Sequence, residues 1–89
     1  MRSEGPFVLV VDDELQIRRF LRISLEANGY QVFETETGHA ALAKAEQLRP
    51  DFIILDMGLP DMDGLDVLKQ LRAWTKVPIV ILSVRDSDQ

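Results

Sequence analysis

Residues 52–64 read FIILDMGLPDMDG: an unbroken apolar run ends in one carboxylate, Asp56, and a loop rich in glycine, proline and aspartate follows. An apolar run that is bounded by turn residues and holds two isoleucines is typical of a strand buried on both faces. In an open parallel sheet, ligands bind just beyond the carboxyl ends of the strands. Asp56 stands at such an end, so it is the first candidate for a functional residue.

Apolar runs and helical patterns alternate on either side of this strand. Strands are expected at residues 7–11, 30–34, 51–56 and 77–83, and helices at residues 15–28, 38–49 and 65–74. Gly29 is expected to end the first helix in a left-handed conformation, Thr37 to cap the second helix, and Pro50 to end it. Because strands alternate with helices, we expect right-handed βαβ units and an α/β fold around a parallel sheet.

Helical spacing of apolar residues predicts which face of each helix is buried. The inward residues expected are Ile17, Phe20, Leu21 and Leu25 in the first helix, Ala41, Leu42, Ala45 and Leu48 in the second, and Leu65, Leu68, Leu71 with Trp74 or Val67 in the third. Arg18, Arg19 and Arg22 fall largely off the first of these stripes. We expect them to form a solvated cationic face.

Composition narrows the class of protein. The chain has 89 residues, enough for one small domain, and a net charge of −5 without a Lys/Arg cluster, which argues against nucleic-acid binding. It has no cysteine, which excludes disulfides and thiolate chemistry. No apolar run reaches the about 18 residues of a membrane span, and no signal peptide precedes the first strand. A cytoplasmic location away from membranes is expected.

Three carboxylates follow two strands that would be neighbours: Asp12 and Asp13 after the first strand, and Asp56 after the third. Like charges gathered at one edge of a sheet repel, and a hard cation with oxygen ligands relieves the repulsion. Mg²⁺ suits such a site because it takes one or two carboxylates and leaves room for a phosphate oxygen. Ser83 ends the fourth strand at the same edge, and Gly58 lets the backbone turn tightly beside Asp56.

These separated motifs together resemble the receiver domain of two-component response regulators. The motifs are Asp12-Asp13, the lone Asp56, the Leu59-Pro-Asp-x-Asp-Gly64 loop and Ser83. Within that family the chain is similar to the OmpR/PhoB subfamily and, inside it, to the regulators of the Kdp potassium-transport operon. The stretches that carry this likeness are Arg18-Arg19-Phe20-Leu21, Leu71-Arg72-x-Trp74 and residues 77–83. The resemblance implies a doubly wound, flavodoxin-like (CheY-like) sheet.

The resemblance also implies a role for each candidate residue. Asp56 would be the phospho-acceptor, taking a phosphoryl group from a sensor histidine kinase. Asp13, Asp56 and the backbone carbonyl of Gly58 would hold Mg²⁺, with Asp12 contributing directly or through water. Ser83 would be the switch hydroxyl that moves toward the phosphoryl group. Such a chain is a phospho-acceptor that switches an output, rather than a turnover enzyme.

The chain departs from the family pattern at its C-terminal end. The strand order expected is 2-1-3-4, with the fifth strand, its lysine and the last helices missing, so residues 1–89 would form a single receiver domain that is incomplete. We expect no output domain within these residues, and DNA would be contacted only through one. We expect the open edge of the fourth strand, or the uncovered sheet face, to drive dimerisation.

Other interpretations of the acidic motifs remain to be weighed. A haloacid-dehalogenase-like phosphatase also uses a strand-end aspartate with Mg²⁺, but it requires a second acid where this chain has Gly58. A degenerate or truncated receiver that acts only as a protein-interaction module is the other alternative. Asp61 and Asp63 are expected to form turns and cap a helix, and His39 is expected to lie exposed at the surface.

Overall fold

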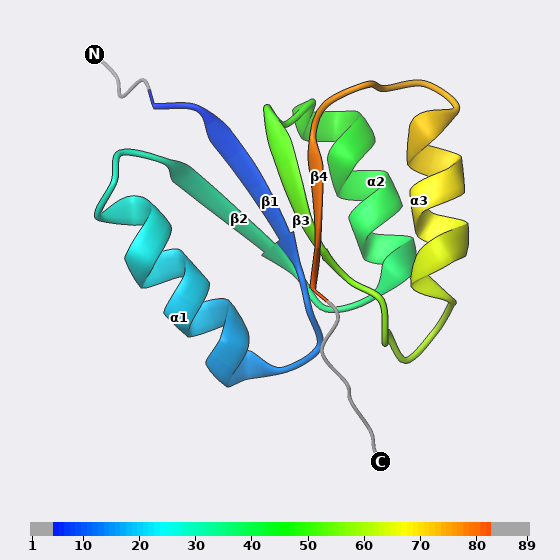
Figure 1. Cartoon of the computed structure of the whole chain (residues 1–89), viewed down its shortest axis with the longest axis horizontal. Helices are drawn as coiled ribbons and strands as arrows, with labels where there is room; N and C mark the ends of the chain where they lie inside the picture. The colour runs from blue at the N-terminus through cyan, green and yellow to red at the C-terminus, as the bar shows by residue number, and fades with distance from the viewer. Residues whose placement is uncertain (1–4, 83–89) are drawn as a thin grey trace.

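The computed structural model describes residues 5–82 as alternating strands and helices (Figure 1). The strands are β1 (Phe7–Val11), β2 (Gln31–Thr35), β3 (Phe52–Asp56) and β4 (Ile79–Leu82), and the helices are α1 (Leu15–Glu26), α2 (Gly38–Leu48) and α3 (Gly64–Arg72). Each element expected from the sequence is present, with ends that differ by at most two residues. Ser83 and the other residues beyond 82 lie outside the described part of the chain.

The four strands form one parallel sheet in the order β2-β1-β3-β4, which confirms the predicted topology. The registers pair Val11 with Thr35 on one side and with Leu55 on the other, and pair Asp56 with Leu82. α1 covers one face of the sheet, and α2 and α3 cover the other (Figure 1). The carboxyl ends of β1 and β3 therefore lie level at one edge of the sheet.

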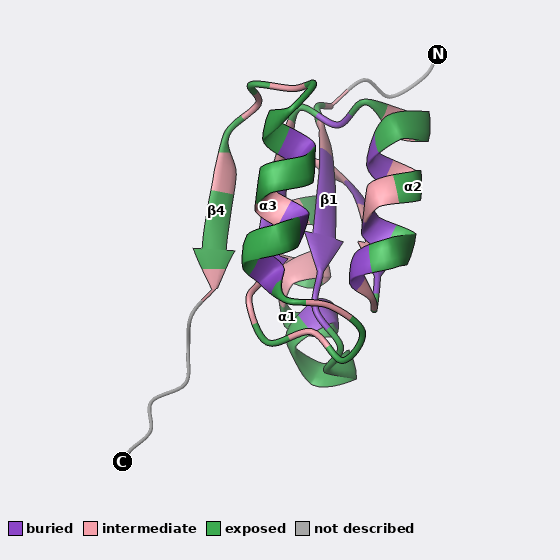
Figure 2. Cartoon of the chain, turned by 90° about the vertical axis from the view of Figure 1, so that its right-hand side faces the viewer, coloured by how far each residue is buried: buried purple, intermediate pink, exposed green. Residues whose placement is uncertain are grey.

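The core is built on the two central strands, as Figure 2 shows for β1. Residues 8–11 are fully buried, as expected for a strand covered on both faces. On one face β1 and β3 pack against Ala41 and Ala45 of α2 and against Val67 and Leu71 of α3. On the other face Leu21 and Leu25 of α1 pack against the sheet. Small alanines let α2 approach the strands closely.

The expected burial of the α1 apolar stripe is only partly correct. Leu21 and Leu25 contact the core, but Ile17 is 37% exposed and Phe20 is 66% exposed. The reason is that α1 packs across β1 and β2, so this part of the stripe faces a hollow beside Leu82. Arg18, which was expected on the solvated face, is buried with 7% of its surface exposed.

The expected inward face of α3 is also corrected. Val67 and Leu71 are buried and Leu68 is half-buried, whereas Leu65 is 46% exposed. The buried line of the helix starts from Gly64, so positions three and seven residues later face the core. Trp74 lies beyond the end of the helix and is 40% exposed, with the Arg49 guanidinium 5.3 Å from its ring centroid.

Several local predictions from the sequence are confirmed. Gly29 has φ +91°, Thr37 accepts a hydrogen bond from the Ala40 amide, and Asp63 accepts one from the Leu65 amide. Arg49 holds a left-handed conformation at the end of α2, with φ 52°, a position where glycine is more common.

No helix in the described range 5–82 is both long and apolar enough to cross a membrane.

Candidate functional site

The structure brings Asp12, Asp13 and Asp56 together, as the sequence predicted. One carboxylate oxygen from each lies within 4.8 Å of the others, at the carboxyl ends of β1 and β3. The register explains this meeting, since Val11 and Leu55 are paired and the acids directly follow them. Asp12 is buried, Asp56 is half-buried and Asp13 is exposed, so the cluster opens toward solvent on the Asp13 side.

Asp12 is held by hydrogen bonds at its amide, its carbonyl and its side chain. Its N–H donates to the Thr35 carbonyl of β2 at 3.1 Å, and its carboxylate Oδ1 accepts from the Glu14 amide at 2.8 Å. Its carbonyl accepts from Nη1 of Arg18 at 2.8 Å. The first acid of the cluster is therefore fixed before any ligand arrives.

Asp56 is oriented by the turn that follows it. The Gly58 amide donates to its Oδ1 at 3.0 Å, which closes a tight turn at the end of β3. The loop then folds back on itself, because the Gly64 amide donates to the Met57 carbonyl at 3.3 Å. A side chain at Gly64 would bring its Cβ within 2.5 Å of Met57 Cα, so this return requires glycine. The sequence analysis did not predict this need.

Burial and neighbouring charge act in the same direction on Asp12. Burial raises the pKa of its carboxyl above the usual 3.8, and the charges of Asp56 and Asp13 raise it further, against the lowering effect of the Glu14 amide. A cation bound by the cluster would favour the ionised form.

Three convergent carboxylates form a hard oxygen donor set, which fits Mg²⁺. Asp12, Asp13 and Asp56 would hold it, and the structure does not test the role predicted for the Gly58 carbonyl.

A hollow of about 450 Å³ lies beside the cluster. Asp12, Asp56 and Glu14 supply its acidic residues, while its apolar residues are Ile17, Phe20 and Leu21 of α1 and Leu82 of β4. This volume lies within the about 300–1,000 Å³ of small-ligand sites. Leu82 pairs with Asp56 across the sheet, so β4 ends at the same edge as the cluster. Ser83, the predicted switch hydroxyl, lies outside the described residues.

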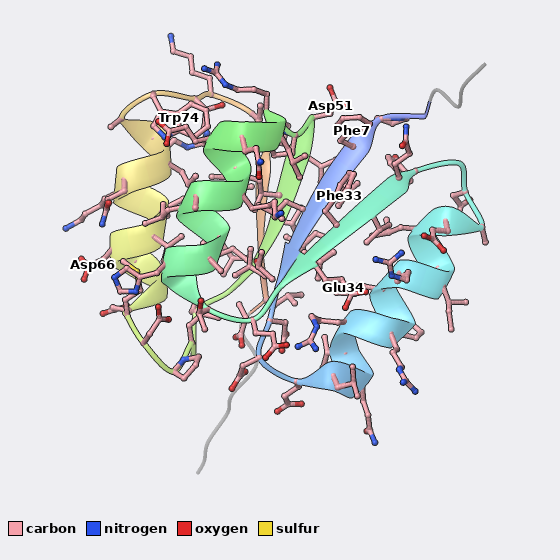
Figure 3. The ribbon with its side chains drawn as sticks, turned by 180° about the vertical axis from the view of Figure 1, so that it is seen from behind. Phe7, Phe33, Glu34, Asp51, Asp66 and Trp74 are labelled. Atoms are coloured by element: carbon pink, nitrogen blue, oxygen red, sulfur yellow. The ribbon has the colours of Figure 1, made fainter. Side chains whose placement is uncertain are left out.

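Two features of this edge were missed by the sequence analysis. The first is the burial of Arg18, which contacts Glu34 of β2 as well as Asp12. Figure 3 shows Glu34 on the side of β2 that faces α1. The second is the partner of Asp61: its carboxylate accepts from the amides of Gly38 at 2.7 Å and His39 at 3.0 Å, at the start of α2. His39 is exposed, as expected, but its Nδ1 also contacts Asp61. In both cases the partner is remote in sequence, so spacing gave no signal.

The fold and the acidic cluster together define a receiver-type signalling domain, and the chain belongs to the response regulator receiver domain family, whose model matches residues 8–89. Receiver domains accept a phosphoryl group and bind Mg²⁺ at an acidic pocket. Among curated proteins, the chain is 51% identical over 81 residues to the KDP operon transcriptional regulatory protein KdpE of Escherichia coli, covering 91% of this chain and 36% of the relative. It is 55% identical over 78 residues to KdpE of Mycobacterium tuberculosis, covering 88% of this chain and 34% of the relative.

Solved structures support the same assignment. The chain matches the chemotaxis protein CheY4 of Vibrio cholerae with a TM-score of 0.86 and 36% identity, covering 94% of this chain and 72% of that one. It matches the BeF3-activated receiver domain of Klebsiella pneumoniae RstA with a TM-score of 0.86 and 28% identity, covering 92% of this chain and 70% of that one.

The two KdpE relatives confirm the likeness to Kdp regulators that the motifs predicted. The chain spans about a third of the length of these curated relatives.

Proposed function

We propose that Asp56 accepts a phosphoryl group from the phosphohistidine of a sensor histidine kinase, with Mg²⁺ held by the acidic cluster. The observation that carries the proposal is the convergence of three carboxylates at the ends of β1 and β3, beside an open hollow. Receiver domains of KdpE-like and PhoP-like regulators interact with sensor histidine kinases. This interaction in related regulators supports a sensor histidine kinase as the phosphoryl donor.

The residues of the chain position the reacting carboxylate. The Gly58 amide orients Asp56 through Oδ1. An Asp56 carboxylate oxygen forms the bond to phosphorus while the bond from phosphorus to the imidazole nitrogen breaks. The imidazole keeps the electron pair and takes up a proton. Mg²⁺, bound by Asp13, Asp56 and the Gly58 carbonyl with Asp12 direct or through water, would neutralise charge on the phosphoryl oxygens.

The consequence of phosphorylation is a switch rather than catalytic turnover. An aspartyl phosphate adds charge and strong hydrogen-bond acceptors, which can draw in a nearby hydroxyl. Ser83 is the residue proposed for that role, and the output is proposed to be a transcriptional domain like that of the KdpE relatives. Phosphatase chemistry of the haloacid-dehalogenase type is disfavoured, because Gly58 occupies the position of the second acid.

The exposed apolar residues of β4 support a second candidate role, that of a protein-interaction module. Val80 and Ile81 are 48% and 40% exposed on β4, which is an edge strand of the sheet formed by the described residues 5–82. An exposed apolar edge is a template for strand pairing with another chain. This role needs no phosphorylation, so the two candidates are separable.

The test of the main proposal is incubation with Mg²⁺ and a small phosphodonor, followed by intact mass. We expect a gain of one phosphoryl group that is lost in Asp56→Asn and on removal of Mg²⁺ with a chelator. Asp51→Asn is the matched control, because it removes a carboxylate that directly precedes β3, at the end away from Asp56, and keeps an oxygen acceptor for the Phe7 amide. Equal labelling of Asp56→Asn and the wild-type chain would refute the assignment.

A further inference from the structure

Arg18 makes a buried set of contacts that the phosphoryl-transfer scheme does not use. Its Nη1 donates to the Asp12 carbonyl at 2.8 Å, and its Nε donates to Oε1 of Glu34 at 2.9 Å. Its Nη2 lies 3.5 Å from Oε2 of Glu36. The side chain is only 8% exposed. A guanidinium is rarely buried unless the groups around it satisfy its donors. Here Asp12, Glu34 and Glu36 supply the acceptors for Arg18.

The contact with Asp12 falls on the peptide unit that joins the first two acids of the cluster. The Asp12 carbonyl belongs to the same planar group as the Asp13 amide, so fixing the carbonyl fixes the orientation of that plane. The preceding peptide unit is also held, because the Asp12 amide donates to the Thr35 carbonyl. The direction in which the Asp13 side chain leaves the backbone depends on this peptide, since the preceding plane sets its φ.

Glu34 in turn holds Arg18. Its Oε2 accepts from Nε of Arg22 at 2.6 Å, and its Oε1 accepts from Nε of Arg18 at 2.9 Å. Hydrogen bonding to Arg22 lowers the pKa of the Glu34 carboxyl against the raising effect of burial, and the hydrogen bond from Arg18 lowers it further. The carboxylate therefore remains ionised at neutral pH. The planar guanidinium holds its N–H donors in fixed directions, so that Arg18 bonds the Asp12 carbonyl and the Glu34 carboxylate together.

Charge balance is a further consequence of this arrangement. An uncompensated guanidinium next to the acidic cluster would oppose the binding of a cation. Glu34 and Glu36 both contact Arg18, so its positive charge is neutralised on the β2 side while one N–H reaches Asp12. The cluster receives a hydrogen-bond donor without receiving a net positive charge.

We propose that Arg18 is a positioning residue for the Asp12–Asp13 pair, and that Glu34 orients and neutralises it. The role extends the proposed function of this site, because it acts on the affinity of the cluster for Mg²⁺. Partners that orient metal ligands typically change metal affinity about 10- to 100-fold when they are removed.

The test uses the 89-residue chain with Arg18→Met, which removes the donors, and Arg18→Lys, which keeps the charge but not the fork. Arg19→Met makes the same charge change at an exposed neighbour, and Leu25→Ala lowers stability from a core contact of the same helix. Mg²⁺ affinity is measured by calorimetry and stability by thermal melting without metal. We expect Arg18→Met to weaken Mg²⁺ binding about tenfold and Arg18→Lys to weaken it less, with both controls within about twofold of wild type.

The outcomes separate this inference from the proposed function. Wild-type Mg²⁺ affinity in Arg18→Met, with a lower melting temperature, would reduce Arg18 to a purely structural role. If the wild-type chain binds no Mg²⁺, the proposed function fails, and the inference is judged from the Asp13 amide resonance without metal. A larger shift of that resonance in Arg18→Met than in Leu25→Ala supports positioning, and equal shifts overturn it. Should Arg18→Met not fold, Glu34→Gln serves the same comparison.

Discussion

Asp12 is the residue at which the requirements of folding and of function oppose each other. It is 4% exposed, and its carboxyl pKa is raised by burial and by the neighbouring acids. Because the pKa in the folded state lies above the unfolded value near 3.8, the metal-free fold loses stability as the pH rises from 3.8 through the raised value. At neutral pH this carboxylate therefore destabilises the empty site. A bound cation reverses that effect.

Replacing Asp12 with asparagine should stabilise the metal-free chain. Asparagine keeps an oxygen acceptor for the Glu14 amide but removes the buried charge. We expect the melting temperature at neutral pH without metal to rise by about 3 °C, and the gap from wild type to close near pH 4. The stabilisation by Mg²⁺ should be smaller than in wild type. Melting curves with and without Mg²⁺ measure both effects, and a less stable variant at neutral pH would contradict the argument.

At the scale of elements, Asp61 ties the β3–α3 loop to the start of α2. Hydrogen bonds from the His39 and Gly38 amides lower the pKa of its carboxyl to about 2. Because the folded pKa lies below the usual 3.8, this stabilisation is complete above about pH 4 and is lost as the pH falls toward 2. The loop that carries Gly58 should therefore loosen in acid.

The Asp61→Asn variant should lose part of the acid dependence of folding. We expect the difference in urea midpoint between wild type and Asp61→Asn to be largest above pH 4 and to shrink toward pH 2. Asp66→Asn, an exposed acid in the first turn of α3, is the control and should follow wild type. An Asp61→Asn midpoint that falls in parallel with wild type over this range would show that Asp61 is not responsible.

Most of the elements and the acidic cluster could be predicted from the sequence, because both depend on local pattern. The strand that ends at Asp56 is a short apolar run, and parallel strands carry the acids that follow them to one edge. The burial of α1 could not be predicted in the same way. Periodicity shows that Ile17 and Phe20 share an apolar face, but not which part of the sheet that face meets. Burial of Arg18 depends on acceptors that the fold brings from Glu34 and Asp12.

At the scale of the whole molecule, apolar surface remains exposed on both faces of the sheet. Phe20 and Ile23 of α1 are 66% and 69% exposed, and Val80 and Ile81 of β4 point to opposite faces of an edge strand. Surfaces of this kind mark sites of association. The proposed self-association therefore has two candidate surfaces, which one substitution can separate.

Val80→Lys should weaken self-association if the β4 edge is the contact. A charged side chain on an edge strand opposes pairing with a second strand. We expect the sedimentation coefficient of wild type to rise with concentration, and that of Val80→Lys to stay nearer the monomer value. Gln70→Lys makes the same charge change on an exposed residue of α3 and should behave as wild type. Unchanged association in Val80→Lys would point to the α1 surface instead.

The position of Trp74 has a consequence for following events at the acidic cluster by light. It is the single tryptophan of the chain, and with Asp51 and Val77 it lines a hollow where β3 and β4 begin, the end of the sheet away from the acids. The Arg49 guanidinium, just past the end of α2, lies over its ring, and we expect the emission of Trp74 to change when this contact moves. Since an ion at the acids cannot touch this ring, any change in fluorescence on adding Mg²⁺ would report motion transmitted through the domain. The chain thus carries its own remote optical probe.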